Sequence, residues 1–305
     1  MKTSAPFAHL NWPSSHRLRA LGIFFLGITI IWGITLYLVQ NAEKSSLVIA
    51  MDRSRLLSRS FAEQARATAR LIDLAATQIA DDWSADPVQF ARQVGRTQKK
   101  ISDITIQVGV VNSEGMLIYS DLGLPPTPLS LKDREHVRVH LDGKDDTLFI
   151  SRPLKGRVSK KWSIQFTRPI RREGRNIGVV VLSVEPGYFV RHFETFNVGE
   201  GGVISLVRHT GELMARGPVS EDYLGTVFKA SPYLSANAAT EGNFHQRSQA
   251  DGVPRTYGYT RLAEFGLIAV AGVSDADALS AYFSQRKWII STATGLSLAL
   301  LLLII

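Results

Sequence analysis

The sequence predicts an α+β protein, with two tandem antiparallel-sheet subdomains on a long N-terminal helix and a membrane-spanning helix on either side of them. Three observations lead to this fold class. Uncharged apolar runs lie near both ends of the chain, a stretch without Gly or Pro follows the first run, and short β-branched segments separated by turn residues make up most of the remainder. Strands and helices in this order are typical of sheets that carry their helices on one side.

The first apolar run, residues 20–42, contains no charged residue. At about 1.5 Å per residue, a helix of this length crosses the hydrocarbon core of a bilayer, which is about 30 Å thick. A cleaved signal peptide is the alternative, although its apolar region would be shorter and only a weak cleavage site is present after the run. We therefore expect an uncleaved anchor. Because His16, Arg17 and Arg19 precede it, residues 1–19 are expected on the cytoplasmic side.

The second apolar run, from Trp288 to Ile305, is also uncharged and is just long enough to cross a bilayer. We expect a second transmembrane helix over residues 286–305. A chain that ends inside a bilayer is unusual, so we expect either that the natural chain continues past Ile305 or that the run is a tail anchor, and we favour continuation. Residues 43–285 would then lie between two spans, outside the cytoplasm.

Residues 43–83 contain no Gly or Pro and are predicted to form a helix about 60 Å long. Apolar residues recur at helical spacing from Leu56 to Ile79, with arginines between them. This helix packs only on its own domain, or a second copy of the chain also covers one stripe of it, and the sequence favours neither. Pro87 is expected to open a second short helix, Val88–Thr97.

The first subdomain is predicted over about residues 84–185. The segment Asn112-Ser113-Glu114-Gly115 has the composition of a hairpin turn. Ser130 or Asp133 is expected to cap a helix that reaches Leu141. The expected strands are Ile101–Val111, Met116–Asp121, Thr147–Arg152, Lys161–Ile170 and Ile177–Val184.

The second subdomain is predicted over about residues 200–273. A connecting helix is expected from Pro186 to Phe196, and further helices at Tyr223–Lys229 and Pro232–Ala239. Ser274 or Asp275 is expected to cap a helix that continues into the second apolar run. The expected strands are Gly202–Arg208, Leu213–Arg216, Gly242–Ser248, Arg255–Leu262 and Leu267–Val273.

The composition excludes several classes of function. The net charge is +8, but no Lys/Arg run of the kind that follows a phosphate backbone is present, so a nucleic-acid partner is not expected. The chain has no cysteine, which removes disulfides, thiolate metal sites and cysteine nucleophiles. Ser151 and Ser163 have no base in sequence context, so nothing indicates a hydrolase triad. We expect no catalytic activity and no cofactor within these residues.

A group of basic side chains between residues 133 and 170 is the strongest functional signal. Arginine offers a planar fork that binds two oxygens of a carboxylate or another small anion. On a helix, Arg134 and Arg138 would share one face and His136 and His140 another, so both pairs cannot point into one pocket. The two histidines have a spacing that can chelate a metal, but no third ligand is evident and no metal is expected. The group consists of Arg134, His136, Arg138, His140, Arg152, Arg157 and Arg168.

Four segments resemble the double Cache (PAS-like, PDC-type) periplasmic sensor domains of bacterial transmembrane signalling proteins, most closely those of diguanylate cyclases. They read DREHVRVHLDG, LFISRPLKGRVSKKWSIQFTRPI, GVVVLSVEPGYFVRHF and GGVISLVRHTGELMAR. The resemblance covers roughly residues 42–285 and the flanking spans. It implies a homodimeric, multi-pass protein of the bacterial inner membrane, with a ligand site in the membrane-distal subdomain in the periplasm. It also implies a cytoplasmic output domain, which would lie beyond residue 305.

The resemblance also identifies candidate ligand residues. Arg134 fills the arginine of an R-x-W-Y-like motif of amino-acid binders, whereas His136 and Val137 replace its aromatic pair. A carboxylate or another small anion is therefore the expected ligand class. Glu185 lies where many amino-acid binders place an acidic residue, with capping of the next helix as the alternative, and for Trp162 the alternative is a core position. The predicted ligand-binding residues are Arg134, His136, Arg138, Arg152, Trp162 and Glu185.

Two alternatives for the output remain open from the sequence. One is that the region belongs to a histidine kinase or a chemoreceptor instead of a diguanylate cyclase. The other is a stand-alone, membrane-anchored ligand-binding protein. The residues after Ile305 in the natural chain would separate these classes.

Overall fold

The computed structural model describes residues 14–84, 86–143, 145–191, 198–218 and 221–303. Most of the segment expected in the cytoplasm, residues 1–13, and the second half of the connecting helix, residues 192–197, lie outside the described residues. The chain divides into two compact units. One combines the residues up to Ile49 with those from Ala278 onward, and the other is Ala50–Asp277.

The unit formed by both ends of the chain is helical. Helix α1 (Ser14–Asp81) begins in it and helix α5 (Asp275–Leu302) ends in it. Among the described residues, α1 is the one helix long and apolar enough to cross a membrane. Its most apolar stretch has a mean hydropathy of 2.2, and almost all side chains in that stretch are exposed. The apolar part of α5 that the structure describes is shorter than the about 20 residues that a span needs. The second membrane crossing therefore stays a prediction.

In the unit Ala50–Asp277, α1 buries one face against both sheets. Its buried side chains belong to the same hydrophobic cluster as residues of the first sheet, such as Val108, and of the second sheet, such as Leu206. Most are alanines, which let the helix backbone approach the sheets closely. The predicted apolar face is confirmed except at Leu56, which is 63% exposed. The buried residues of this face are Phe61, Ala62, Ala65, Ala69, Ile72, Ala75, Ala76, Ile79 and Ala80.

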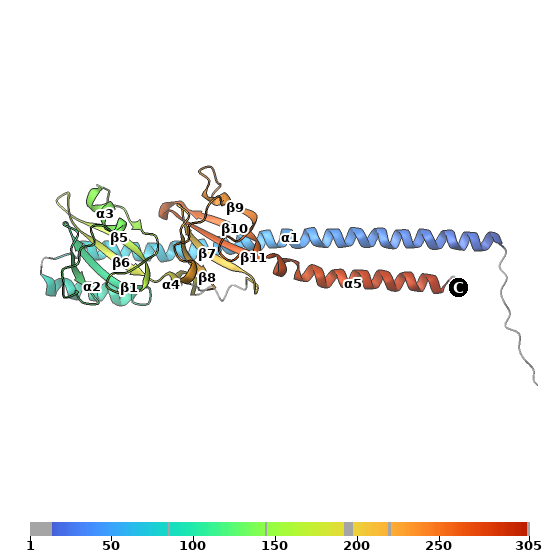
Figure 1. Cartoon of the computed structure of the whole chain (residues 1–305), viewed down its shortest axis with the longest axis horizontal. Coiled ribbons are helices and arrows are strands. Elements are labelled where there is room, and N and C mark those ends of the chain that lie inside the picture. Colours follow the sequence, from blue (N-terminus) through green and yellow to red (C-terminus); the bar gives the residue numbers. More distant parts are fainter. Residues whose placement is uncertain (1–13, 85, 144, 192–197, 219–220, 304–305) are drawn as a thin grey trace, which may run out of the picture. The chain divides into compact units, whose positions relative to one another are not determined.

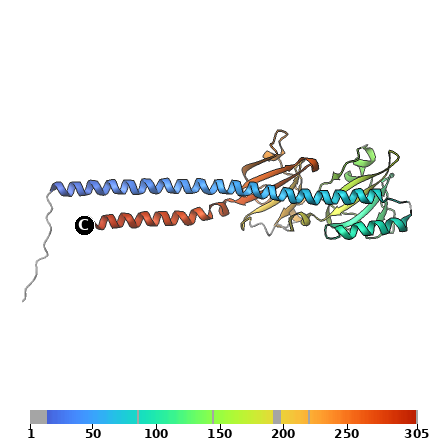
Figure 2. The same ribbon diagram turned by 180° about the vertical axis from the view of Figure 1, so that it is seen from behind.

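The first sheet is antiparallel, with strand order β2-β1-β6-β5-β3 and β4 paired to β5. Figure 1 shows its central strands β1, β6 and β5. Helices α1 and α2 (Pro87–Ile101) cover one of its faces (Figure 2). Helix α3 (Glu135–Asp142) packs on the other face through Val137, which belongs to the same hydrophobic cluster as Val111, Val179 and Val181. The strands are β1 (Thr105–Asn112), β2 (Leu117–Ser120), β3 (Phe149–Ile150), β4 (Leu154–Lys155), β5 (Trp162–Arg172) and β6 (Arg175–Val184).

The second sheet repeats this arrangement with strand order β8-β7-β11-β10-β9, again antiparallel. Helix α4 (Pro186–Arg191) comes after the first sheet, and β11 leads directly into α5. Of the two expected caps, Ser274 caps α5, because its Oγ accepts a hydrogen bond from the amide of Asp277 at 3.1 Å. The strands are β7 (Val203–Arg208), β8 (Leu213–Gly217), β9 (Glu241–Arg247), β10 (Pro254–Leu262) and β11 (Leu267–Ser274).

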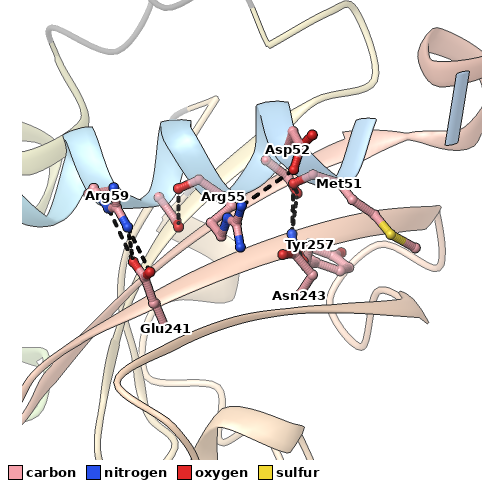
Figure 3. Close-up of polar contacts among 9 residues, drawn as sticks. Met51, Asp52, Arg55, Arg59, Glu241, Asn243 and Tyr257 are labelled. Carbon is pink, nitrogen blue, oxygen red and sulfur yellow. Dashed lines mark hydrogen bonds and ion pairs between the residues drawn. The ribbon is translucent and has the colours of Figure 1, made fainter. Parts of the chain in front are cut away.

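Polar contacts hold α1 against the second sheet (Figure 3). The guanidinium of Arg59 donates two hydrogen bonds to Glu241 through Nη2 at 2.6 and 2.7 Å. The Asn243 amide donates to the backbone carbonyl of Met51 at 2.7 Å. Gly258 on β10 lies directly under the helix, where a Cβ atom would overlap the backbone of Ser54. A glycine is therefore required for the close approach of helix and sheet.

Several predicted elements were wrong in type or extent. Two expected helices are only 3-10 turns, η2 (Glu221–Tyr223) and η3 (Pro232–Leu234), and Gly225 has a φ of 78° that ends any regular helix there. Helix α3 is preceded by Arg134 and not by Ser130 or Asp133 at its cap position. Residue Ile101 ends α2, so the first strand begins later than expected, at Thr105.

Candidate functional site

A cavity of about 40 Å³ lies in the first subdomain, between the sheet and the cover that α3 and the β4–β5 hairpin form. The central strands of the sheet make its floor. The start of α3 and the hairpin make its roof and side wall. It is lined by Gln107, Gly109, Leu117, Leu131, Arg134, His136, Leu154, Gly156, Arg157, Val158, Gln165, Val181 and Ser183.

The floor is a row of polar side chains across three adjacent strands. Ser183 on β6 is paired in register with Gln107 on β1 and with Gln165 on β5. All three are buried, at 8% exposure or less. The Ser183 hydroxyl donates to Gln165 Oε1 at 2.7 Å, and Gln107 Nε2 donates to the Ser120 hydroxyl at 2.9 Å. Buried amides are costly unless they are paired, so this row is a polar surface built inside an otherwise apolar sheet.

The roof carries Arg134 and His136. Arg134 precedes α3 in an extended conformation, and its side chain forms no hydrogen bond or ion pair with any residue that the structure describes. His136 is 3% exposed, and its Nδ1 has no hydrogen-bond partner among those residues. A buried ring nitrogen without a partner is uncommon in proteins and indicates a place for a group that is not part of the chain.

The electrostatics of the roof favour an anion. Burial, together with the positive charge of Arg134, lowers the pKa of His136 to about 3, so its imidazole is neutral near pH 7. Burial and the neighbouring Arg157 also lower the pKa of Arg134 from its usual value. Arginine keeps its charge in either case, so the cavity is positive without a bound anion.

The side wall is the hairpin of β4 and β5, which is fastened to the segment before α3. Arg157 in the hairpin donates to both carboxylate oxygens of Asp133, at 2.7 and 2.5 Å, and to the carbonyl of Ser130 at 2.6 Å. This bidentate pair holds the hairpin over the cavity. Asp133 is exposed, so water reaches its ion pair with Arg157. This pair can therefore break without opening the core.

His140 and Arg168, two members of the basic group, stabilise the fold. The Nε2 of His140 lies 2.9 Å from the Thr167 hydroxyl and 3.1 Å from its carbonyl oxygen, away from the cavity. Arg168 binds Asp73 of α1 through two hydrogen bonds of 2.5 and 3.0 Å. Neither residue lines the cavity.

Four of the predicted ligand residues also lie outside the cavity. Arg138 is exposed on α3 and lines a shallow depression with Asp142, and Arg152 is exposed after β3. Trp162 and Glu185 line a different cleft, between the two subdomains. The structure thus brings Arg134 and His136 together and separates them from the other four, whose roles as ligand residues stay predictions.

The polar floor was not among the features predicted from the sequence. Gln107, Gln165 and Ser183 each interrupt an apolar strand, in the segments TIQVGVV, SIQFT and VVLSV. A polar side chain in the centre of a buried strand is a signal for a site. This signal is present in the sequence but carries weight only when the three strands are known to be neighbours.

A family comparison covers the second half of this unit. Residues 186–272 match the family model dCache_1_like, which is described as a histidine kinase sensor domain. No curated protein matches the chain in sequence. The expected Cache type is thus supported, whereas the expected closeness to diguanylate cyclases stays a prediction.

Solved structures extend the likeness to both subdomains. The extracellular domain of a candidate histidine kinase, rpHK1S-Z16, is 24% identical with a TM-score of 0.66, and covers 77% of this chain and 98% of its own. The Pseudomonas aeruginosa PAO1 amino acid chemoreceptor PctB, in complex with L-Arg, is 14% identical with a TM-score of 0.56, and covers 74% and 94%.

The Campylobacter jejuni chemoreceptor Tlp3, in complex with 4-methylisoleucine, is 15% identical with a TM-score of 0.51, and covers 78% of this chain and 94% of its own. In each case the domain concerned is the extracellular or ligand-binding one. This chain therefore has the Cache-like fold of sensor domains in histidine kinases and chemoreceptors.

Proposed function

We propose that this protein is a transmembrane signal receptor that binds a small carboxylate, or a closely related anion, in the cavity of the first subdomain. The observation that carries the proposal is that the Arg134 guanidinium and the buried Nδ1 of His136, neither of which has a partner among the described residues, lie together above a polar floor. A carboxylate oxygen can accept two hydrogen bonds from the Arg134 fork, and the neutral imidazole of His136 supplies a further hydrogen bond.

The volume of the cavity sets the size of the ligand. About 40 Å³ holds only a few water-sized groups. A short monocarboxylate fits the closed cavity, and a larger amino acid needs the hairpin to move outward. The structures of PctB and Tlp3 are complexes with amino acids, which carry a carboxylate, and this supports the same charged group in the ligand proposed here. His136 and Val137 depart from the aromatic pair of amino-acid binders, so we propose a small carboxylate in general and not an amino acid in particular.

The setting of the domain is part of the same proposal. The apolar part of α1 supports a membrane anchor, and the Cache-like fold supports a sensor outside the cytoplasm. We place the protein in the bacterial inner membrane as a multi-pass homodimer with a periplasmic sensor. Its output is of the histidine kinase, chemoreceptor or diguanylate cyclase type, and the residues described carry no enzymatic activity of their own.

A thermal-shift experiment on the full chain in detergent tests the ligand. Formate, acetate, propionate, lactate and a set of amino acids are each added, and the unfolding midpoint is measured. A ligand that binds only the native state stabilises it by about 2.7 kcal/mol at a concentration of 100 times its Kd. We expect short carboxylates to raise the midpoint and neutral analogues of equal size to leave it unchanged.

Two arginines of the same segment provide the matched variants. Arg134→Gln should weaken binding about 10- to 100-fold, because it removes a charged hydrogen-bonding fork worth about 1.5–3 kcal/mol. Arg138→Gln makes the same chemical change outside the cavity and should alter affinity less than twofold. Equal effects of the two variants, or no effect of Arg134→Gln, would contradict the site.

A further inference from the structure

The two subdomains meet at a cleft of about 430 Å³ that is separate from the cavity. We propose that this cleft is a second ligand site, for a small organic polyanion. Its walls come from β1, the β4–β5 hairpin, the turn between β6 and α4, the end of β8, and η2. Pockets that bind small molecules commonly have volumes of about 300–1,000 Å³, so the size is suitable.

One wall of the cleft is strongly basic. Lys155, Lys160 and Lys161 all lie on the β4–β5 hairpin and all line the cleft. Within the described part of the chain, none of these ammonium groups forms an ion pair or a side-chain hydrogen bond. Three like charges on one short hairpin repel one another, and an anion between them relieves that repulsion.

The carboxylates of the cleft do not balance these lysines. Glu185 and Glu221 are its acidic lining residues. Glu185 is already paired with Arg191, at 2.7 Å. The lining includes one more cation, Arg216 at the end of β8. Positive side chains therefore outnumber negative ones along the lining.

Arg216 differs from the lysines because it is buried. It is 7% exposed, and its hydrogen bond goes to Asp251. Asp251 also accepts two hydrogen bonds from Arg255, at 2.8 and 2.9 Å, and Arg255 is 4% exposed. Two buried guanidinium groups thus share one carboxylate, which leaves one positive charge uncompensated inside the second subdomain.

The unused donors of Arg216 point to a ligand. Its Nε and Nη1 groups have no hydrogen-bond partner among the residues that the structure describes. Burial and the charge of Arg255 lower the pKa of Arg216, which is the response expected of a cation short of a counter-ion. An anionic group in the cleft would supply both the charge and the acceptors.

The lining also suits a carbon skeleton. The Trp162 ring lies in the cleft with the ammonium of Lys155 at 5.6 Å from its centroid, and Ile106 and Leu224 add apolar surface. Pockets for small organic molecules commonly combine apolar and aromatic lining with a few charged groups that fix the orientation of the ligand. The expected ligand is therefore an organic molecule with two or more carboxylate or phosphate groups.

Isothermal titration calorimetry on the full chain in detergent tests this site. The probes are citrate and pyrophosphate, each at constant ionic strength, with chloride as the reference anion. Both are too large for the cavity of about 40 Å³ in the first subdomain unless the β4–β5 hairpin moves outward, and the Arg134→Gln variant identifies any binding there. We expect saturable binding of one probe molecule per chain. Preference for citrate identifies a polycarboxylate site, and preference for pyrophosphate a phosphate site.

A pair of double variants controls for charge. Lys160→Gln with Lys161→Gln should weaken the preferred probe at least 10-fold. Lys99→Gln with Lys100→Gln removes the same charge from the exposed end of α2 and should change affinity less than twofold. The unfolding midpoints without anion show that both variants fold.

Three outcomes overturn the proposal. They are no saturable binding of either probe, equal loss in both double variants, and unchanged affinity in the Lys160 and Lys161 variant. The Arg134→Gln variant tells binding in the cleft from binding in the cavity. It should lose affinity for the short carboxylate in the cavity but retain binding of the probe in the cleft.

Discussion

The two subdomains share a strand order but differ in what covers the sheet face opposite α1. In the first, the edge of the sheet is broken into β3 and β4, of 2 residues each; α3 comes before β3, and β4 forms the hairpin with β5. In the second, the corresponding edge strand, β9, is continuous over 7 residues. The broken edge lets α3 and the hairpin roof the cavity, whereas β9 pairs with β10 along its whole length.

The side chains on these equivalent faces differ in the same sense. The first sheet presents Gln107, Ser183 and Gln165 to its cavity. The second sheet presents aromatic rings, and Phe244 stacks on Tyr257 with centroids 4.9 Å apart. The second sheet also borders a cavity, of about 30 Å³, whose lining combines four aromatic rings with polar and charged side chains such as Gln246 and Arg216. Under the proposed function, the first subdomain is the receptor and the second is a support that holds α1 and leads into α5.

The largest expected effect is an acid sensitivity that comes from the first subdomain. Burial lowers the pKa of His136 to about 3 and of His140 to about 4. Below pH 6.5 the unfolded chain therefore binds protons that the folded chain excludes, and stability falls as the pH falls. Each histidine should remove about 2 kcal/mol between pH 7 and pH 5, which gives about 4 kcal/mol for the pair. Urea unfolding at each pH measures the loss.

Single variants assign that loss to the two histidines. His136→Gln and His140→Gln should each flatten the dependence of the unfolding free energy on pH by about one proton, whatever they do to stability at pH 7. If neither variant changes the slope of unfolding free energy against pH, the acid sensitivity does not come from these histidines. The first subdomain would then not differ from the second in its response to acid.

A smaller effect separates two glycines, one from each sheet. Gly258→Ala should destabilise the protein by about 3 kcal/mol, because the added methyl overlaps the α1 backbone at Ser54. Gly109→Ala adds the same methyl to the cavity floor, where the nearest atom, Leu117 Cδ1, is 3.4 Å away. It should cost little stability but reduce carboxylate binding. Equal losses of stability in the two variants would contradict the distinction between support and receptor.

The loss of stability at alkaline pH should come from the second subdomain. Burial raises the pKa of Tyr233 to about 12. Between pH 10 and pH 12 the unfolded chain loses a proton that the folded chain keeps, so stability falls as the pH rises. The expected loss is about 1.4 kcal/mol at pH 11. In the Tyr233→Phe variant this loss of stability should be absent, as measured by urea unfolding at pH 9 and 11. An unchanged loss in the variant would show that Tyr233 is not its source.

The smallest effect is expected at the contact between α1 and β9. Glu241→Gln weakens the exposed pair with Arg59 and should lower the unfolding midpoint only slightly, and less at high salt. Asn243→Ala removes a donor to the Met51 carbonyl and should lower the midpoint more, because a backbone acceptor loses its additional partner. A larger effect of Glu241→Gln would show that charge, not the amide bond, fastens the helix.

Much of the fold could be predicted from local patterns. The apolar spacing from Phe61 to Ile79 predicted the buried face of α1, and turn residues located the hairpins. The helices expected at Tyr223–Lys229 and Pro232–Ala239 were wrong because Gly225 and the short turns around it end regular structure after a single turn. Local helix preference could not show that the sheet leaves no room for them.

The site was predicted only in part, for reasons of geometry. Arg134 and His136 were found because their chemistry is distinctive. Arg138 was grouped with Arg134 by helical spacing, but Arg134 precedes the helix, so the spacing rule does not apply to it. The polar floor depends on the register of β1, β6 and β5. These strands are distant in the sequence, so no single segment predicts how they pair.

The β4–β5 hairpin offers a position for a fluorescent label. Its Gly156, Arg157 and Val158 line the cavity, while its lysines line the cleft, so one short segment borders both spaces. The chain has no cysteine. A single Lys160→Cys substitution would therefore accept a fluorescent dye at one position only, on the hairpin but outside the cavity. The hairpin is thus a natural place to build an optical reporter of cavity occupancy.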